Sequence, residues 1–402
     1  MRTVWLGIAS TWCLVPLAGC GGNDAAAPTG GGPAAVTGDS AAFPLTAYRV
    51  RPPQTAARPP APPAPTPPLV LAAPPDQTKL FDGQDLSGAD AGELSALAGQ
   101  AAGGRNYKLA LQAQYWAVKQ SGDGRYNLAC YYARTKQADA ALYFLQEAAK
   151  LEGVEADDAR KDDDLAGLRR DPRFARVLTY FQASADHAAV ATEPVSLCYL
   201  PAGFDAAKPT AVVLLLHGRG SRPADFLGDG TQKYADRLGV PIISVSGTNP
   251  TGPKSFVWAV DVAKDFDRLD AAVQKHANES KFQPVAGQFV AVGFSEGAQV
   301  GLDIAMYHPE LFAGAIAMSP GALSQLSKLR PHPLLAKRSF VITVGAAEER
   351  GNVSLAAIDA SAVQFAKAAC EHIVVPNGGH ALPPDFDAKF PEWVARILAA
   401  AK

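Results

Sequence analysis

A serine between two glycines is the strongest candidate for a reactive group in this chain. Residues 293–297 read Gly-Phe-Ser-Glu-Gly, with Ser295 at the centre. The apolar run 288–292 precedes them, and the small-residue helical pattern 298–302 follows them. A sharp turn from strand to helix strains the serine backbone, needs glycine on both sides and exposes the hydroxyl. The pattern predicts that Ser295 is a nucleophile, with the positive end of the next helix directed at any oxyanion formed nearby.

A serine hydroxyl needs a base to act as a nucleophile, and histidine is best matched to neutral pH. Four histidines follow the serine: His308, His332, His372 and His380. His308 lies near a predicted helix end, His332 between prolines, and His372 at the start of a predicted strand. His380 lies on a glycine loop after the last apolar strand and before the final helix. We therefore predict that His380 is the base.

The third group needed is a carboxylate that orients the imidazole, in a loop between the serine and the histidine. Residues 341–345 form an apolar strand that ends in glycine, and Glu348 follows three residues later, with Glu349 beside it. Asp303 and Asp359 are the nearest aspartates, and both lie on predicted helices. The sequence therefore predicts Glu348 as the acid and Glu349 as the alternative. A solvated surface charge cluster is the competing interpretation.

A second glycine-rich segment, residues 216–220, reads Leu-His-Gly-Arg-Gly and ends the most hydrophobic predicted strand. This H-G-x-G segment, followed roughly 70–80 residues later by G-x-S-x-G, resembles the α/β-hydrolase family. The likeness covers about residues 190–402 and is greatest to phospholipase/carboxylesterase enzymes and to feruloyl esterase and polyhydroxybutyrate depolymerase types. It implies that the backbone N–H groups of Arg219 and Glu296 form the oxyanion hole. We predict that His217 is a structural loop residue rather than the base.

One position departs from the family pattern. The family usually has aspartate where this chain has Glu348, so an impaired enzyme is an alternative reading. Phe294 and Trp258 resemble residues on the substrate side and are candidates for the wall of an acyl pocket, although aromatic residues near a cleft are as often part of the core. No metal ion and no organic cofactor is expected.

The part of the chain after residue 186 alternates apolar runs with helical patterns, which is typical of a mostly parallel sheet with helices on both faces. Its reactive groups should lie at the carboxyl ends of the strands. Helices are expected over 263–277 and 391–400. The predicted strands are 195–200, 211–216, 241–246, 288–292, 313–318, 340–344 and 372–375. The fold class predicted for residues 186–402 is therefore α/β, of the α/β-hydrolase type.

The first residues are typical of export. Residues 1–19 have a positive start and an apolar stretch too short and too interrupted to span a membrane. Residues 17–20 read Leu-Ala-Gly-Cys and resemble the lipobox of bacterial lipoproteins, which implies lipidation of Cys20 and attachment to the cell envelope, with Gly21 favouring the outer membrane. An ordinary secretory signal is the alternative. Residues 20–78 are rich in Pro, Ala and Gly and are expected to form a disordered tether.

Residues 79–185 have helical spacing. Segments 126–133 and 138–149 are predicted to be antiparallel helices, with a weaker upstream partner over 94–118 whose period, nearer 31 than the usual 34, fits less well. The pattern resembles a tetratricopeptide repeat. Its close-packing positions are Ala129, Ala133, Ala141 and Ala148. The segment is either a groove that binds a protein partner or, as we favour for so few repeats, a packing platform for the next domain.

The net charge and the cysteine spacing exclude some classes of function. The chain has 402 residues and a net charge of −2, which argues against a nucleic-acid partner. Its five cysteines include no C-x-x-C pair, so a zinc knuckle is not expected, and Cys198 and Cys370 form either a disulfide or two buried thiols. We predict an envelope serine hydrolase acting on carboxylic esters. The alternatives are an inactive envelope interaction protein and a peptidase or amidase on the same fold.

Overall fold

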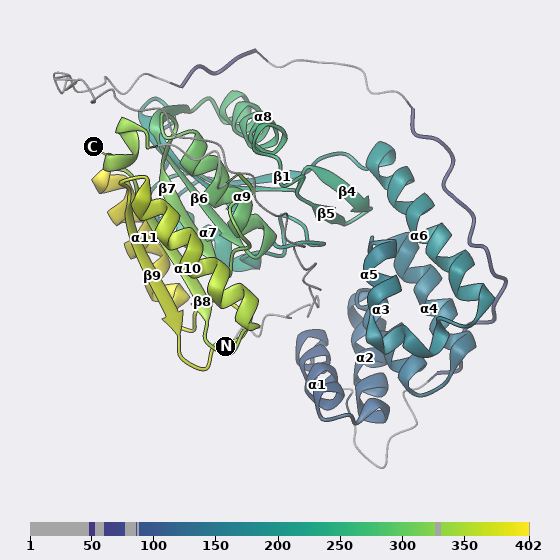
Figure 1. Cartoon of the computed structure of the whole chain (residues 1–402). Helices are drawn as coiled ribbons and strands as arrows, with labels where there is room; N and C mark the ends of the chain where they lie inside the picture. The colour runs from purple at the N-terminus through teal and green to yellow at the C-terminus, as the bar shows by residue number, and fades with distance from the viewer. Residues whose placement is uncertain (1–47, 53–59, 77–85, 87, 326–330, 402) are drawn as a thin grey trace, which may run out of the picture.

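The structure, a computed structural model, describes residues 48–52, 60–76, 86, 88–325 and 331–401. The predicted export signal and Cys20 lie outside the described residues. Figure 1 shows a helical part and a larger part built around a sheet. Among the helices described, none is both long and apolar enough to cross a membrane.

The helical part contains two helix hairpins followed by a closing helix. The hairpins are α1 (Ala91–Gly103) with α2 (Tyr107–Ser121), and α3 (Arg125–Arg134) with α4 (Ala138–Leu151). Then come α5 (Ala156–Lys161), the 3₁₀ helix η1 (Asp163–Leu168) and α6 (Pro172–Ala191). Small side chains allow the helices to approach closely, because Ala129, Ala141 and Ala148 are fully buried. Asp171 caps α6, which continues to Ala191, beyond the boundary at residue 185 that the sequence predicts.

The sheet has seven strands in the order β1-β3-β2-β6-β7-β8-β9, and only β1 is antiparallel to its neighbour in this sheet. The strands are β1 (Ser196–Tyr199), β2 (Pro209–Leu216), β3 (Ile242–Val245), β6 (Gln283–Phe294), β7 (Phe312–Met318), β8 (Ser339–Gly345) and β9 (Ala369–Val375). All seven correspond to predicted strands. A separate hairpin, β4 (Asn249–Gly252) and β5 (Ser255–Val257), is not among the predicted strands, because its strands are short and carry proline, glycine and polar residues.

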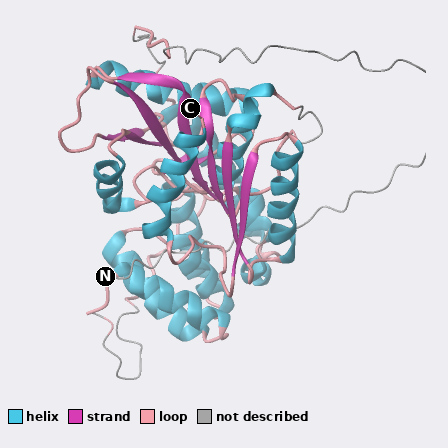
Figure 2. Cartoon of the chain, turned by 90° about the vertical axis from the view of Figure 1, so that its left-hand side faces the viewer, coloured by secondary structure: helices cyan, strands magenta, loops and turns pink. Residues whose placement is uncertain are grey.

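Helices cover both faces of the sheet, as Figure 2 shows, so the predicted α/β fold class is confirmed. Alternate residues of β2 face opposite ways: Leu214 packs with α8 (Val262–Ser280), α9 (Glu296–Tyr307) and α10 (Arg350–Phe365), and Leu215 packs on the other side. That other side is covered by α7 (Thr231–Leu238) and α11 (Phe386–Ala400).

Helix α11 begins at Phe386 rather than at Pro391, where the sequence pattern predicts its start. Pro391 has no N–H group for the carbonyl of Asp387, four residues earlier in the helix. Arg237 Nη1 donates to that carbonyl oxygen at 3.3 Å instead. A partner from outside the helix therefore allows proline in its interior.

The described parts of the expected tether contact both folded parts. Tyr48 N donates to the Pro284 carbonyl at 3.3 Å. Leu69 exchanges two hydrogen bonds with the side chain of Gln146 on α4, at 2.8 and 3.3 Å. The side chains of Tyr48 and Leu69 also pack against the two cores. These contacts explain why the two stretches are ordered, although their composition predicts a disordered tether.

The disulfide alternative for Cys198 and Cys370 is wrong. Cys198 lies on β1 and Cys370 on β9, at opposite edges of the sheet, and both are free thiols. Burial raises the pKa of Cys198 to about 12 and that of Cys370 to about 11, so both thiols stay protonated at neutral pH.

Candidate active site

Ser295 forms the turn between β6 and α9 and has strained backbone angles, φ 55° and ψ −123°. The two neighbouring glycines have no room for a side chain. A Cβ atom added at Gly293 would lie 2.2 Å from the carbonyl oxygen of Gly297, and one added at Gly297 would lie 2.3 Å from that of Leu216. The strand, turn and helix predicted for residues 293–297 are therefore present, and glycine is required at both flanking positions.

The loop after β2 lies against this turn. Leu216 at the end of β2 is in register with Gly293, and a Cβ added at Gly218 would lie 3.5 Å from the Cβ of Ser295. His217 is fully buried: its Nδ1 donates to the Gly218 carbonyl at 2.7 Å, and its Nε2 accepts from Gly247 N at 2.9 Å. Burial lowers the pKa of His217 to about 4. It is a neutral structural residue, as its sequence context predicts.

Glu348 and His380 form a hydrogen-bonded pair at the ends of β8 and β9. Glu348 Oε2 lies 2.8 Å from His380 Nδ1 and also accepts from Asn352 Nδ2 at 3.2 Å. Glu348 Oε1 accepts from Ser319 Oγ at 2.5 Å and from Gly345 N at 3.0 Å. Burial alone would raise the pKa of Glu348, but the hydrogen bonds from His380, Ser319 and Gly345 outweigh it and hold the pKa below its ordinary value. The carboxylate is therefore ionised and fixed in place.

The imidazole of His380 lies beside the serine turn. Its ring centroid is 4.8 Å from that of Phe294, the residue before Ser295. Phe294 is partly exposed beside His380, and its place in the wall of an acyl pocket stays a prediction. Glu349, the alternative acid, is exposed at the start of α10 and does not cap that helix with its side chain. The structure thus brings His380 together with Glu348 rather than with Glu349.

The other three histidines have different surroundings. The ring of His308 stacks on Phe266 with centroids 4.0 Å apart, and His332 accepts from Leu334 N at the start of a short 3₁₀ helix. His372 lies within β9, where burial lowers its pKa.

Of the two alternatives that the sequence leaves open for Trp258, a pocket wall or the core, the structure shows the core. Trp258 is 3% exposed; its Nε1 donates to the His217 carbonyl at 2.9 Å, and its backbone N donates to Glu296 Oε2 at 2.9 Å. Glu296 Oε1 also lies 3.2 Å from Arg219 Nη1. Trp258 and the side chains of Glu296 and Arg219 therefore hold the backbone of the predicted oxyanion hole in place. Glu296 is also the first residue of α9, where backbone amides have no hydrogen-bond partner within the helix.

Two further side chains that hold Glu348, those of Ser319 and Asn352, are not predicted from the sequence. Ser319 follows β7 directly and has a positive φ of 53°. A serine before proline at the end of an apolar strand was the available signal. No local pattern marks Asn352, which reaches Glu348 only because one turn of α10 brings it back.

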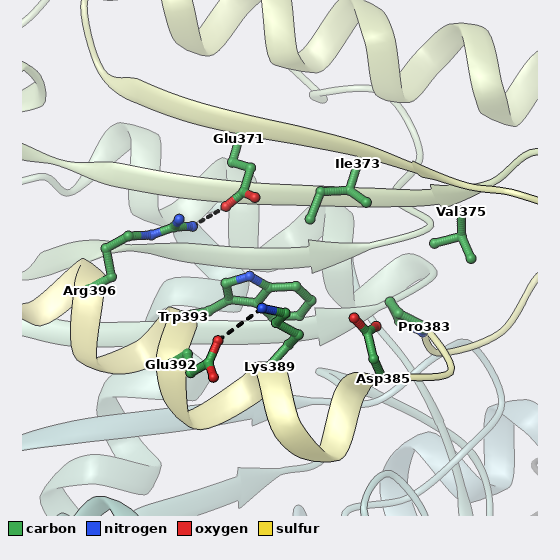
Figure 3. Close-up of a pocket in the computed structure, with 9 residues that line it drawn as sticks. All are labelled: Glu371, Ile373, Val375, Pro383, Asp385, Lys389, Glu392, Trp393 and Arg396. Carbon is green, nitrogen blue, oxygen red and sulfur yellow. Dashed lines mark hydrogen bonds and ion pairs between the residues drawn. The ribbon is translucent and has the colours of Figure 1, made fainter.

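Two other features lie apart from this site. Cys130, Asp162 and Asp164 group their ligand atoms within 4.8 Å in the helical part, but burial raises the Cys130 pKa well above its usual range, and a metal would need the thiolate. A hollow of about 260 Å³ between β9 and α11 is lined largely by charged side chains, with Arg396 paired to Glu371 and Lys389 to Glu392 (Figure 3).

No family model matches the chain. NocK of Nocardia uniformis subsp. tsuyamanensis, provisionally named an esterase, is 27% identical over 124 residues, which are 30% of this chain and 36% of that protein. The chain thus matches about a third of that relative's length. A solved carboxylesterase of Bacillus cereus is 22% identical with a TM-score of 0.41, over 55% of this chain and 98% of the other. A ferulic acid esterase is 16% identical with a TM-score of 0.42, over 52% and 94%.

Proposed function

We propose that this protein is a serine hydrolase that cleaves carboxylic ester bonds, with Ser295, His380 and Glu348 as its catalytic triad. The observation that carries the proposal is the hydrogen bond of 2.8 Å between the buried carboxylate of Glu348 and the partly exposed His380, whose imidazole packs against the residue preceding a strained, glycine-flanked serine. Strained backbone at a serine is costly and is retained mainly where function requires it. The partial likeness to NocK agrees with an esterase.

In the proposed reaction, Ser295 Oγ attacks the ester carbonyl carbon and its proton passes to His380 Nε2. Glu348 accepts from Nδ1 and stabilises the imidazolium that forms. The tetrahedral intermediate collapses, the alcohol leaves with the proton from His380, and the acyl group stays on the serine. Water then attacks the acyl-enzyme by the same route, releasing the acid and restoring Ser295.

The oxyanion of each tetrahedral intermediate would accept hydrogen bonds from the backbone N–H groups of Arg219 and Glu296. The loop after β2 and the start of α9 meet at Ser295, and the dipole of α9 adds positive potential there. Each such donor contributes about 3–4 kcal/mol to transition-state stabilisation. The fixed ionised state of Glu348 favours an active site over the impaired alternative.

Replacement of the nucleophile tests the proposal. Ser295→Ala is expected to lower kcat for p-nitrophenyl acetate by at least about 10³-fold and to abolish labelling by a fluorophosphonate, with little change in the thermal midpoint. Ser361→Ala, which removes an exposed serine on α10, is the matched control and should keep full activity. Undiminished turnover in Ser295→Ala would overturn the assignment.

We further propose that the chain is held on the cell envelope by lipid on Cys20. The support is the lipobox-like Leu-Ala-Gly-Cys at residues 17–20. Two or three acyl chains give stable anchoring, whereas one chain gives only reversible binding. In bacterial cells, Cys20→Ser is expected to prevent palmitate incorporation and to move the protein from the membrane to the soluble fraction. Unchanged membrane association would contradict the anchor.

A further inference from the structure

The side chain of Arg219 joins the predicted oxyanion hole to the helical part. Its guanidinium pairs with Glu155 and lies 3.8 Å from Asp158; Glu155 precedes α5 and Asp158 lies on it. The same guanidinium contacts Glu296 through Nη1 at 3.2 Å. One arginine is therefore shared between a carboxylate of the helical part and the carboxylate of the residue after the nucleophile.

A close backbone contact fixes Glu155 beside Arg219. A Cβ added at Gly153, which has a φ of +66°, would lie 2.5 Å from the carbonyl carbon of Thr251, and one added at Gly252 would lie 2.9 Å from Gly153 N. Thr192, just after α6, donates to the Gly252 carbonyl at 3.4 Å. Figure 1 shows β4 and β5 extending from the sheet part toward α6. The turn that carries Glu155 thus rests directly on the β4–β5 hairpin.

The hairpin in turn holds the loop after β2. Gly220 N donates to the Phe256 carbonyl at 2.9 Å, and Phe256 N donates to the Ser221 carbonyl at 3.0 Å. Ser255 Oγ donates to the Gly220 carbonyl at 3.1 Å. The residues on the carboxyl side of Arg219 are therefore hydrogen-bonded to the element on which the helical part is docked.

We propose that the helical part belongs to the active site, and that Glu155 is a positioning residue that orients the oxyanion-hole backbone through Arg219. The inference rests on the proposed esterase function. The Glu296 side chain is 4% exposed and that of Arg219 is 25% exposed, so their contact is shielded from solvent. With Glu155 present, the guanidinium is held from two sides. Without it, the guanidinium keeps only Glu296 and the more distant Asp158 at 3.8 Å, so the arginine and the loop that carries its N–H gain freedom.

The test uses the full chain and p-nitrophenyl acetate. Glu155→Gln is expected to lower kcat about tenfold with KM within about twofold, a smaller loss than the roughly 10²–10³-fold cost of removing an oxyanion donor. Glu155→Asp keeps the charge and should recover part of the rate. Asp157→Asn removes the same charge from an exposed site of α5 that pairs with Arg160 instead, so its kinetics should match the unmodified protein.

Hydrogen exchange gives a readout that does not depend on ester hydrolysis. In Glu155→Gln, amides of residues 217–222 should exchange about fivefold faster or more, with no change in Asp157→Asn. Absence of Ser295-dependent hydrolysis in the unmodified chain would contradict the proposed function only. Amide hydrogen exchange of residues 217–222 would still decide whether Glu155 holds the loop. Equal kinetic losses in Glu155→Gln and Asp157→Asn, a raised KM at constant kcat in Glu155→Gln, or unchanged exchange would each overturn the positioning role.

Discussion

Glu348→Gln separates the charge of the predicted acid from its shape. In the native protein Oε1 accepts two hydrogen bonds, from Ser319 Oγ and Gly345 N. The backbone N–H is a donor only, so the carbonyl oxygen of a glutamine should take the Oε1 position. Its NH₂ group then lies where Oε2 now faces His380 Nδ1.

An NH₂ group in that position donates to His380 Nδ1, so the imidazole must carry its proton on Nε2. That tautomer cannot accept the proton of Ser295 Oγ. A comparable change of tautomer in a serine protease costs about 10⁴-fold in kcat, so we expect a loss of roughly 10³–10⁴-fold here. The fold should survive, because both hydrogen bonds on the carbonyl side are kept and Asn352 can turn its amide to accept.

The assay is kcat for p-nitrophenyl acetate, with the thermal midpoint measured on the same samples. Glu349→Gln is the matched control, since this neighbour is exposed and should leave kcat within about twofold. If Glu348→Gln keeps more than about a tenth of the rate, or if Glu349→Gln shows the large loss, the assignment of the acid and the tautomer argument are both wrong.

Two further substitutions test the scaffold. Gly293→Ala places a Cβ 2.2 Å from the Gly297 carbonyl oxygen, so it should lower the free energy of unfolding by about 3 kcal/mol or more, whereas Gly351→Ala, with open space around it, should have little effect; equal thermal midpoints would contradict the steric argument. Burial raises the pKa of Asp359 from 3.8 to about 7, so its ionised form destabilises the folded state increasingly as the pH rises from about 4 through 7. Asp359→Asn should therefore stabilise the protein at pH 8, by up to about 4 kcal/mol, but hardly at pH 4; denaturant unfolding that gave the same gain at both pH values would refute this account.

The sequence was sufficient wherever the structural requirement is local. The steric need for glycine at residues 293 and 297 arises within one turn, so the pattern around Ser295 could be read directly. The seven strands of the main sheet are long apolar runs between helical patterns, and they were all predicted. The proximity of His380 and Glu348 follows from strand order, because the carboxyl ends of parallel strands meet at one edge.

Contacts between segments that are distant in the chain have no local sequence pattern that predicts them. The role of Trp258 depends on its two hydrogen bonds, to His217 and Glu296, which bring it inside the core rather than to a pocket wall. The pairing of Arg219 with Glu155 joins segments that only the packing of the β4–β5 hairpin brings together. An aromatic side chain can lie in many parts of a core, and a charged side chain can pair with many partners. The sequence positions of Trp258 and Arg219 alone therefore do not predict the contacts that each makes.

The glutamate at position 348 follows from how its loop is fixed. Ala346 N donates to the Val375 carbonyl at 2.9 Å, and Ala347 N donates to that of Gly378 at 2.7 Å, so backbone contacts set the distance between this loop and the one that carries His380. The side chain of Glu348 folds back so that its carboxylate reaches Gly345 N at its own strand end. An aspartate there would be shorter by one C–C bond, about 1.5 Å, and could not reach both Gly345 N and His380 unless the loop moved. Since the backbone contacts hold the loop, the longer side chain is what closes the network. The loop spacing therefore explains why a glutamate rather than an aspartate fits this position, and its presence does not argue against the proposed triad.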